Sequence, residues 1–240
     1  MRTKIIILCL LIFNTILGQK SYMFEYNYTF KKDTLSEEFF TEKYYLVNYE
    51  NNNFFISESD LNLFESKDEL DQIYQGYGTI KGFSKNFKPS RLKSLKINKQ
   101  ENITFFKSYF NKIKVKYNDT LTLNWSITGD TLTYNGYKCN VATAFYSGRE
   151  YKAYFTNTIP YHYGPYVFTG LPGLIVYLSD NNQSHIFELS KITNKIFSFS
   201  IDDFIDVSKN KFNQIEYEYK TNPLQLLLPN KNISNEKNKK

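Results

Sequence analysis

The 240-residue sequence has few of the residues on which recognisable catalytic and metal sites depend. It contains two cysteines, two histidines and one tryptophan. No Gly-x-Ser-x-Gly, His-Glu-x-x-His, phosphate-loop or calcium-loop pattern occurs. No apolar run reaches the roughly 18 residues that a membrane-spanning helix needs. These absences favour a non-enzymatic protein without a cofactor and with no transmembrane segment in the mature chain, although they do not exclude an enzyme.

Aromatic residues, by contrast, are abundant. The chain has 21 tyrosines and 21 phenylalanines, and 41% of its residues are hydrophobic. Tyrosine and phenylalanine suit half-buried pleated surfaces, so this composition indicates strands. The length fits one ordinary domain with extensions.

The N-terminus has the three parts of a secretory signal. Arg2 and Lys4 precede an apolar run, and Gly18 is the small residue before the expected cleavage site. Cys9 lies inside the apolar run and follows Leu8, so it does not suit a lipoprotein anchor. We therefore expect an exported protein, periplasmic or secreted, that is not a lipoprotein.

The basic charge lies mostly outside the predicted domain. Removal of residues 1–18 lowers the net charge from +6 to +4, and residues 231–240 contribute +3 of the remainder. A nearly neutral body gives little support for nucleic-acid binding. We predict a signal peptide over residues 1–18, a single β-rich domain over 19–228 and a disordered basic tail over 229–240.

Strand patterns fill most of this domain. Residues 22–31 alternate aromatic and polar side chains, which is typical of a half-buried strand. A capping-box spacing at Ser66 and Glu69 indicates a short helix or a loop over 66–74. Residues 201–219 partly suit a helix that covers a sheet face. The other predicted strands are 42–49, 54–58, 103–109, 112–117, 120–127, 137–146, 150–156, 174–179 and 185–192, with turns at Gly129-Asp130 and Ser147-Gly148.

Sequential strands joined by short turns predict antiparallel pairing. We expect a mainly β fold, one large curved antiparallel sheet with a short helical cover. A half-barrel of the lipoprotein-carrier type is one such shape. A closed barrel or a sandwich is the alternative.

One loop before the strand 174–179 is unusually rich in proline and glycine. The pair Pro172-Gly173 suits the two central positions of a type II turn, because proline fixes φ and glycine accepts a positive φ. The loop has two readings: a locked crossover that plugs the sheet, or a rigid binding surface. Its structural positions are Gly164, Pro165, Gly170, Pro172 and Gly173, and its candidate ligand-binding residues are Tyr161, His162, Tyr163, Tyr166 and Phe168.

Several motifs occur together in this half of the chain, in a fixed order. They are Trp125, Gly136-Tyr-Lys-Cys139, Gly148-Arg149, Phe155-Thr156 and Gly170-Leu-Pro-Gly-Leu-Ile175. This segment resembles the GLPGLI family of exported proteins from Bacteroidetes-type bacteria. That family frequently has tryptophan near Tyr154 and Tyr166, where this chain has tyrosine. The resemblance implies an envelope location and names no reaction.

Four residues have a possible chemical role beside a structural one. Cys139 suits a core position on a strand, yet with His162 and His185 it forms a weak candidate for a metal site, which we do not favour. As a nucleophile, Cys139 would need one of these histidines as its base. Arg149 is a sixth candidate ligand-binding residue, because its guanidinium can bond carbonyls of the Pro/Gly loop.

The sequence is compatible with three functions. The favoured one is a non-enzymatic binding module of the cell envelope for an apolar or extended ligand, such as a lipid, a peptide or an outer-membrane protein. The second is an envelope metal-handling protein that uses Cys139 and histidine. The third is a hydrolase.

Overall fold

A computed structural model describes residues 22–32, 37–49, 52–65, 90–98, 102–108, 113–194 and 200–221. The predicted signal, the helix or loop over 66–74 and the basic tail lie outside these residues. The described strands are β1 (Tyr22–Lys31), β2 (Phe39–Tyr49), β3 (Asn52–Ser57), β4 (Ser94–Ile97), β5 (Ile103–Ser108), β6 (Lys114–Asp119), β7 (Ser126–Tyr134), β8 (Tyr137–Tyr146), β9 (Arg149–Thr156), β10 (Leu174–Asp180), β11 (His185–Asn194) and β12 (Ile205–Asp206).

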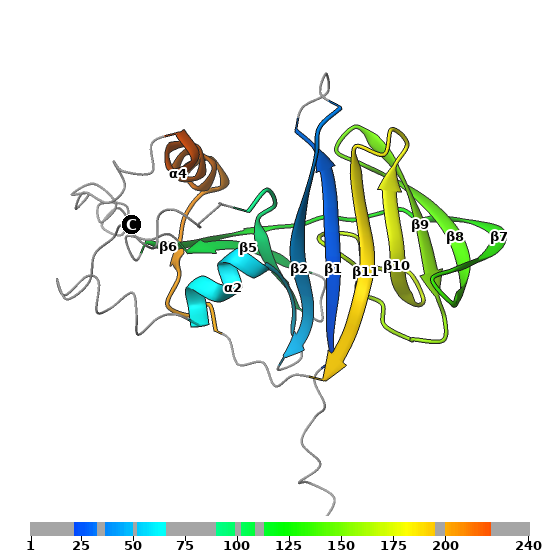
Figure 1. Ribbon diagram of the computed structural model, residues 1–240. Coiled ribbons are helices and arrows are strands. Elements are labelled where there is room, and N and C mark those ends of the chain that lie inside the picture. Colours follow the sequence, from blue (N-terminus) through cyan, green and yellow to red (C-terminus); the bar gives the residue numbers. More distant parts are fainter. Residues whose placement is uncertain are drawn as a thin grey trace, which may run out of the picture.

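These strands form a single sheet in the order β12-β6-β5-β4-β3-β2-β1-β11-β10-β9-β8-β7 (Figure 1). Every described neighbour pair is antiparallel except β12 and β6, which are parallel. The sheet does not close, since β12 and β7 lie at its two ends. The expected curved antiparallel sheet with a short helical cover is confirmed, and the closed alternative is wrong.

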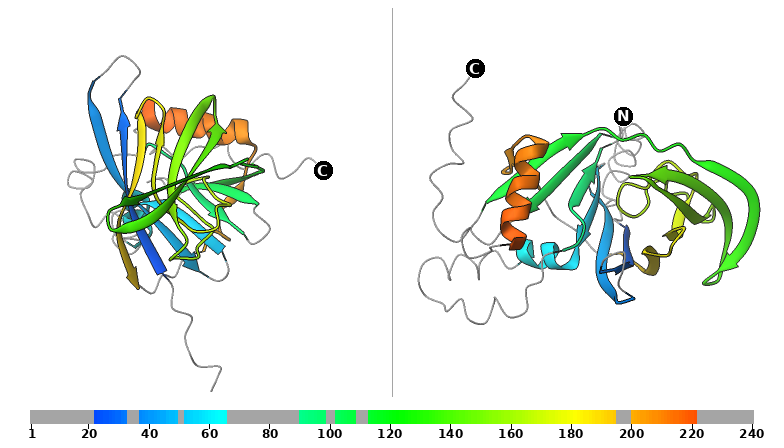
Figure 2. Two further views of the ribbon diagram at one scale, coloured as in Figure 1. Left: turned by 90° about the vertical axis from the view of Figure 1, so that its right-hand side faces the viewer. Right: turned by 90° about the horizontal axis from the view of Figure 1, so that it is seen from above.

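The connection from β6 to β7 shows how strongly the sheet curls. Seven Cα steps separate Asp119 from Ser126, which span at most about 25 Å. The two strands are ten positions apart in the sheet order, or about 48 Å across a flat sheet. The two halves must therefore curl toward each other, and the view from above shows the connection crossing between them (Figure 2).

The crossing also corrects one predicted strand. Residues 120–125 join no ladder, and β7 begins only at Ser126. The predicted turn at Gly129-Asp130 is instead a bulge inside β7, where the pairing register shifts between Ile127 and Thr131. The turn lies at Asn135-Gly136, whose φ angles of 45° and 81° suit a two-residue hairpin.

The two faces of the sheet bury different clusters. The inner, concave face carries Phe24, Tyr26 and Tyr28 of β1 within the main core, and Trp125 of the crossing packs against that core. The outer face carries a smaller cluster that includes Val47 and Phe106. Alternation along β1 places its aromatic rings inward, as the sequence predicts.

Two described helices cover opposite faces. Helix α2 (Glu58–Glu65) contributes Leu61 to the outer cluster, while α4 (Lys209–Thr221) contributes Phe212 to the main core. A serine hydroxyl caps each helix: Ser57 accepts a bond from the backbone N–H of Asp60 at 3.0 Å, and Ser208 does the same for Lys211 at 3.2 Å. No helix in the described part of the chain is both long and apolar enough to cross a membrane.

Candidate functional site

The Pro/Gly loop fills part of the inner face. Phe168 is 1% exposed, and its ring lies 4.6 Å from Tyr151 and 5.4 Å from Tyr146, measured between ring centroids. Val167 and Leu171 are also buried in the main core. The loop thus supplies core side chains, as expected for a locked crossover that fills one part of the sheet.

The other aromatic candidates of the loop also face the sheet. Tyr161 lies 4.6 Å from Phe24, and Tyr166 lies 6.1 Å from Phe105. Burial raises the pKa of both tyrosines, and both are half-buried, as is Tyr163. Of the five loop candidates, His162 alone is exposed.

Hydrogen bonds fix the backbone of this loop. The N–H of Gly170 donates to the His162 carbonyl at 2.8 Å, and the Trp125 indole donates to the Thr169 carbonyl at 2.7 Å. His162 Nδ1 lies 3.1 Å from the carbonyl oxygen of Leu171. The exposed histidine therefore helps to hold the loop.

The predicted type II turn at Pro172-Gly173 is wrong, because Gly173 does not have a positive φ. A Cβ at Gly173 would lie 2.2 Å from the Thr156 carbonyl oxygen, so close approach to β9 requires this glycine. The positive φ of the motif, 94°, belongs to Gly170.

Arg149 does not bond the loop. Its Nη1 donates to Oδ2 of the buried Asp180 at 2.6 Å, which joins the β8–β9 turn to the β10–β11 turn. The other oxygen of Asp180 accepts the backbone N–H of His185 at 2.9 Å, and His185 Nδ1 lies 2.7 Å from the Tyr28 hydroxyl. Burial lowers the pKa of His185, while Asp180 opposes that shift. The predicted contact of Arg149 is thus replaced by an interlock between two hairpins.

Cys139 occupies a core position. The side chain is fully buried, and its thiol contacts the Tyr137 carbonyl oxygen at 3.4 Å. Burial raises the pKa of the thiol, which disfavours the nucleophilic thiolate. Within the described residues no His, Cys, Asp or Glu side chains gather into a group able to hold a metal, so Cys139, His162 and His185 do not come together.

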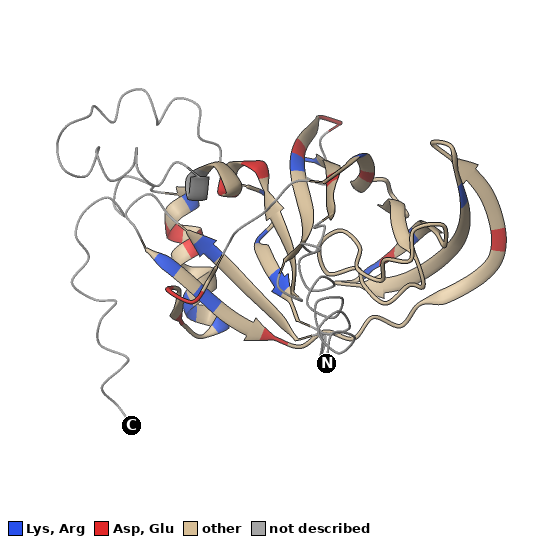
Figure 3. Ribbon diagram, turned by 90° about the horizontal axis from the view of Figure 1, so that it is seen from below, with Lys and Arg blue, Asp and Glu red and all other residues tan. Residues whose placement is uncertain are grey.

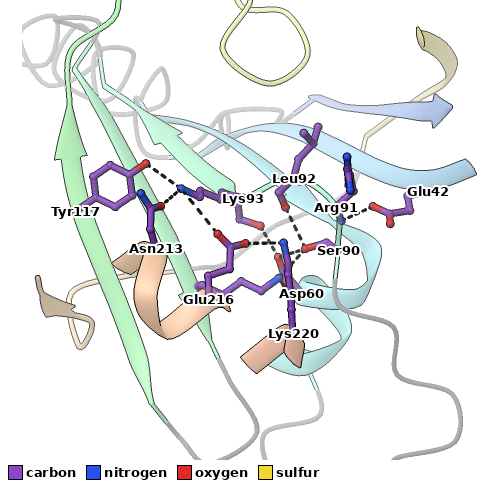
Figure 4. Close-up of polar contacts among 12 residues, drawn as sticks. Glu42, Asp60, Ser90, Arg91, Leu92, Lys93, Tyr117, Asn213, Glu216 and Lys220 are labelled. Atoms are coloured by element: carbon purple, nitrogen blue, oxygen red, sulfur yellow. Dashed lines mark hydrogen bonds and ion pairs between the residues drawn. The ribbon is translucent and has the colours of Figure 1, made fainter. Parts of the chain in front are cut away.

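A polar network that the sequence did not reveal fastens α4 to the sheet (Figure 4). Lys93 donates to Asn213 at 2.6 Å and pairs with Glu216 at 3.8 Å. Its ammonium also lies 5.1 Å from the ring centroid of Phe212 and 5.3 Å from that of Tyr117. Burial lowers the pKa of Lys93, which Glu216 opposes. These contacts hold α4 against the sheet, so we assign Lys93 a structural role rather than a place in a ligand site.

A second network lies beside it and is fully buried. Lys107 pairs with Asp60 at 2.7 Å and donates to Ser90 at 2.6 Å, and Ser94 donates to Asp60 at 2.7 Å. Both charged side chains are 1% exposed. No sequence motif marks this pair, since Lys107 and Asp60 are 47 residues apart.

Strand β7 is the open end of the sheet. All its residues are exposed except Leu132 and Tyr134, which are half-buried. No described strand pairs with the edge of β7 that faces away from β8. Figure 3 shows few charged residues along β7 and β8, where Asp130 and Lys138 are the charged side chains. Ile127 is 54% exposed and Phe145, on the neighbouring β8, is 75% exposed.

The register identifies the backbone groups that β7 leaves unpaired. Tyr134 and Tyr137 flank the two-residue turn, and such flanking residues exchange both ladder hydrogen bonds. Hydrogen-bonded and non-bonded pairs then alternate, so Thr133 and Thr131 point their N–H and C=O groups away from β8. Both threonines are exposed.

The outer face beside this edge carries a cluster of tyrosines around a carboxylate. Tyr154 pairs with Tyr177, and Tyr177 pairs with Glu188, so their side chains share the outer face. The hairpin of β7 and β8 brings Tyr134 onto the same cluster, where its hydroxyl donates to Glu188 Oε1. The Tyr154–Tyr177 and Tyr134–Tyr177 ring centroids are 4.9 and 5.0 Å apart. We call these four residues the tyrosine–glutamate cluster.

These features define the class of the protein as an open, strongly curved antiparallel sheet whose inner face is filled by its own loop and helix. No protein-family model matches the chain, and no curated protein matches it. Two solved structures of PNGF-II, in space groups P21 and C2, are similar in fold. Each has a TM-score of 0.54 and 13% identity over 83% of this chain. The chain spans about a third of the PNGF-II length, 34% and 33%. At this identity the likeness shows the fold alone.

Proposed function

We propose that this protein is an exported, non-enzymatic binding module of the cell envelope. In this proposal it holds an extended segment of a partner protein by adding it as a strand to β7. The GLPGLI-like motifs and the signal-like N-terminus support the envelope location. The open β7 edge is the observation that carries the binding role.

The edge has what strand addition requires. Thr131 and Thr133 offer outward N–H and C=O groups, which give affinity in this mode of recognition. The exposed side chains of Ile127 and Phe145 offer apolar contacts nearby. The other end of the sheet is a poor site, because β12 is two residues long.

An extended partner is favoured over an apolar small ligand. The inner face, which would hold such a ligand, is covered by Phe168 of the loop and Phe212 of α4. A second copy of this chain is also disfavoured, because antiparallel pairing of two β7 strands about their centre places Asp130 opposite Asp130.

Site-specific photo-crosslinking in the native host tests the proposal. A photoreactive side chain at Thr131 should give one defined adduct, whose crosslinked peptide mass spectrometry identifies. The same group at Tyr217 of α4, which is 70% exposed, is the matched control. A synthetic copy of the peptide should bind the isolated protein and slow amide exchange at Thr131 and Thr133.

A proline substitution on β7 tests whether the partner segment binds through the backbone of this strand. Thr133→Pro removes an outward N–H that the β7–β8 ladder does not use, and we expect about tenfold weaker peptide binding. Thr133→Ala keeps the N–H and should bind as the wild type does. Equal binding by the two variants would overturn the proposal, as would the same adducts from Thr131 and Tyr217.

A further inference from the structure

The tyrosine–glutamate cluster has an uncompensated charge. Glu188 is half-buried, and within the described residues no cation pairs with it. Its Oε1 accepts the Tyr134 hydroxyl, whereas no described donor reaches Oε2. A half-buried carboxylate without a positive partner attracts a cation, because the cation offsets the cost of its partial desolvation.

One lysine in the same cross-strand row as Glu188 is already engaged. The cross-strand row that contains Glu188 continues through Asn27 to Lys43. Lys43 instead pairs with Glu25 and Glu58, each at 3.5 Å. Lys43 therefore does not compensate the charge of Glu188.

The rings around Glu188 indicate the chemistry of that partner. Tyr134, Tyr154 and Tyr177 are each half-exposed, and their centroids lie within 5.6 Å of one another. The negative face of an aromatic ring attracts ammonium and guanidinium groups, more strongly where water is partly excluded. Burial, together with the Glu188 carboxylate, raises the pKa of Tyr134, so this hydroxyl stays protonated and donates to Glu188.

We infer that the tyrosine–glutamate cluster is a binding site for an organic cation, the ammonium or guanidinium of a lysine or arginine side chain. This inference rests on the proposed function for the source of the cation, an extended partner segment on β7. Tyr134 is the last residue of that strand and also part of the cluster. A segment paired along β7 therefore runs toward the site, and its basic side chain supplies the charge that Glu188 lacks.

Small probes separate this inference from strand addition. The probe is Nα-acetyl-lysine methylamide, and the neutral control is Nα-acetyl-norleucine methylamide, which has nearly the same shape. Binding is followed by NMR of ring-labelled tyrosine. We expect the lysine probe alone to shift the ring signals of Tyr154 and Tyr177.

Two variants locate the site. Glu188→Gln keeps an acceptor for Tyr134 but removes the charge, and we expect about tenfold weaker binding of the lysine probe. Glu150→Gln is the matched control, because Glu150 lies on β9 and already accepts a hydrogen bond from Asn181 at 2.8 Å. It should bind the probe as the wild type does, and thermal unfolding of both variants checks that they fold.

Equal shifts from the lysine and norleucine probes would overturn the inference. Unchanged affinity for the lysine probe in a folded Glu188→Gln variant would also overturn it. The cluster would then have only a structural role, in holding the β7–β8 hairpin against the sheet. Either result would leave strand addition at β7 standing, because that proposal is measured at Thr131 and Thr133. Loss of strand addition with a retained lysine site would remove only the source of the cation.

Discussion

The buried pair of Lys107 and Asp60 allows a quantitative test of how α2 is held to the sheet. Lys107→Met preserves the length of the side chain but leaves the Asp60 carboxylate 1% exposed and without its cation. Removing one partner of a buried pair costs about 3–5 kcal/mol, because the remaining charge is uncompensated. Hydrogen bonds from Ser94 and Ser90 to Asp60 remain, so we expect the free energy of unfolding to fall by about 3 kcal/mol, the lower end of this range.

Urea unfolding of four proteins measures this effect. The set is the wild type, Lys107→Met, Asp60→Leu and the double variant, in a double-mutant cycle. The double variant should recover much of the loss, because it removes both charges. The matched control is Lys209→Met, whose partner is Asp119 at 2.7 Å and whose side chain is 59% exposed. Exposed pairs contribute less than about 1 kcal/mol.

Two results would show that the buried pair does not stabilise the protein in this way. One is a loss for Lys107→Met no larger than that for Lys209→Met. The other is a double variant whose loss equals the sum of the two single losses, since the pair would then have no coupling energy.

Two further predictions concern pH and backbone packing. Burial lowers the pKa of His185 below its ordinary value of 6.5, so stability is fully present above that pH and falls as pH drops through the folded pKa. His185→Gln should flatten this acid limb in thermal unfolding from pH 7 to pH 5, and an unchanged slope would contradict the assignment. Gly173→Ala should destabilise the protein by at least about 2 kcal/mol, because the new Cβ would lie 2.2 Å from the Thr156 carbonyl oxygen. Gly136→Ala, with nothing within 4 Å of its Cβ, should lose only about 1 kcal/mol from its positive φ, and equal losses would count against close packing.

Local pattern was sufficient for much of the sheet. The aromatic alternation in 22–31 predicted β1 at its observed bounds, and Ser147-Gly148 predicted the β8–β9 turn. The turn after β7 lies at Asn135-Gly136, which is a strong hairpin signal. The predicted turn at Gly129-Asp130 is a bulge, because glycine with a positive φ serves both structures.

The candidate site depends on bulges that alternation cannot reveal. Strict alternation would place Ile175 and Tyr177 on the same face of β10. The register shifts between them, so Ile175 stays with the core while Tyr177 joins Tyr154 and Glu188 on the outer face. The sequence carries no sign of this shift.

The amino-acid sequence by itself therefore determined most of the strands and the antiparallel pairing of those that follow one another across short turns. These features depend on residues close together in the chain, where alternation and turn chemistry act. Only the tertiary structure decided that the loop fills the inner face, that Arg149 reaches Asp180 and that β7 is the open edge. It also decided that tyrosines from three strands surround Glu188, because curl, register and bulges are set by contacts between distant segments.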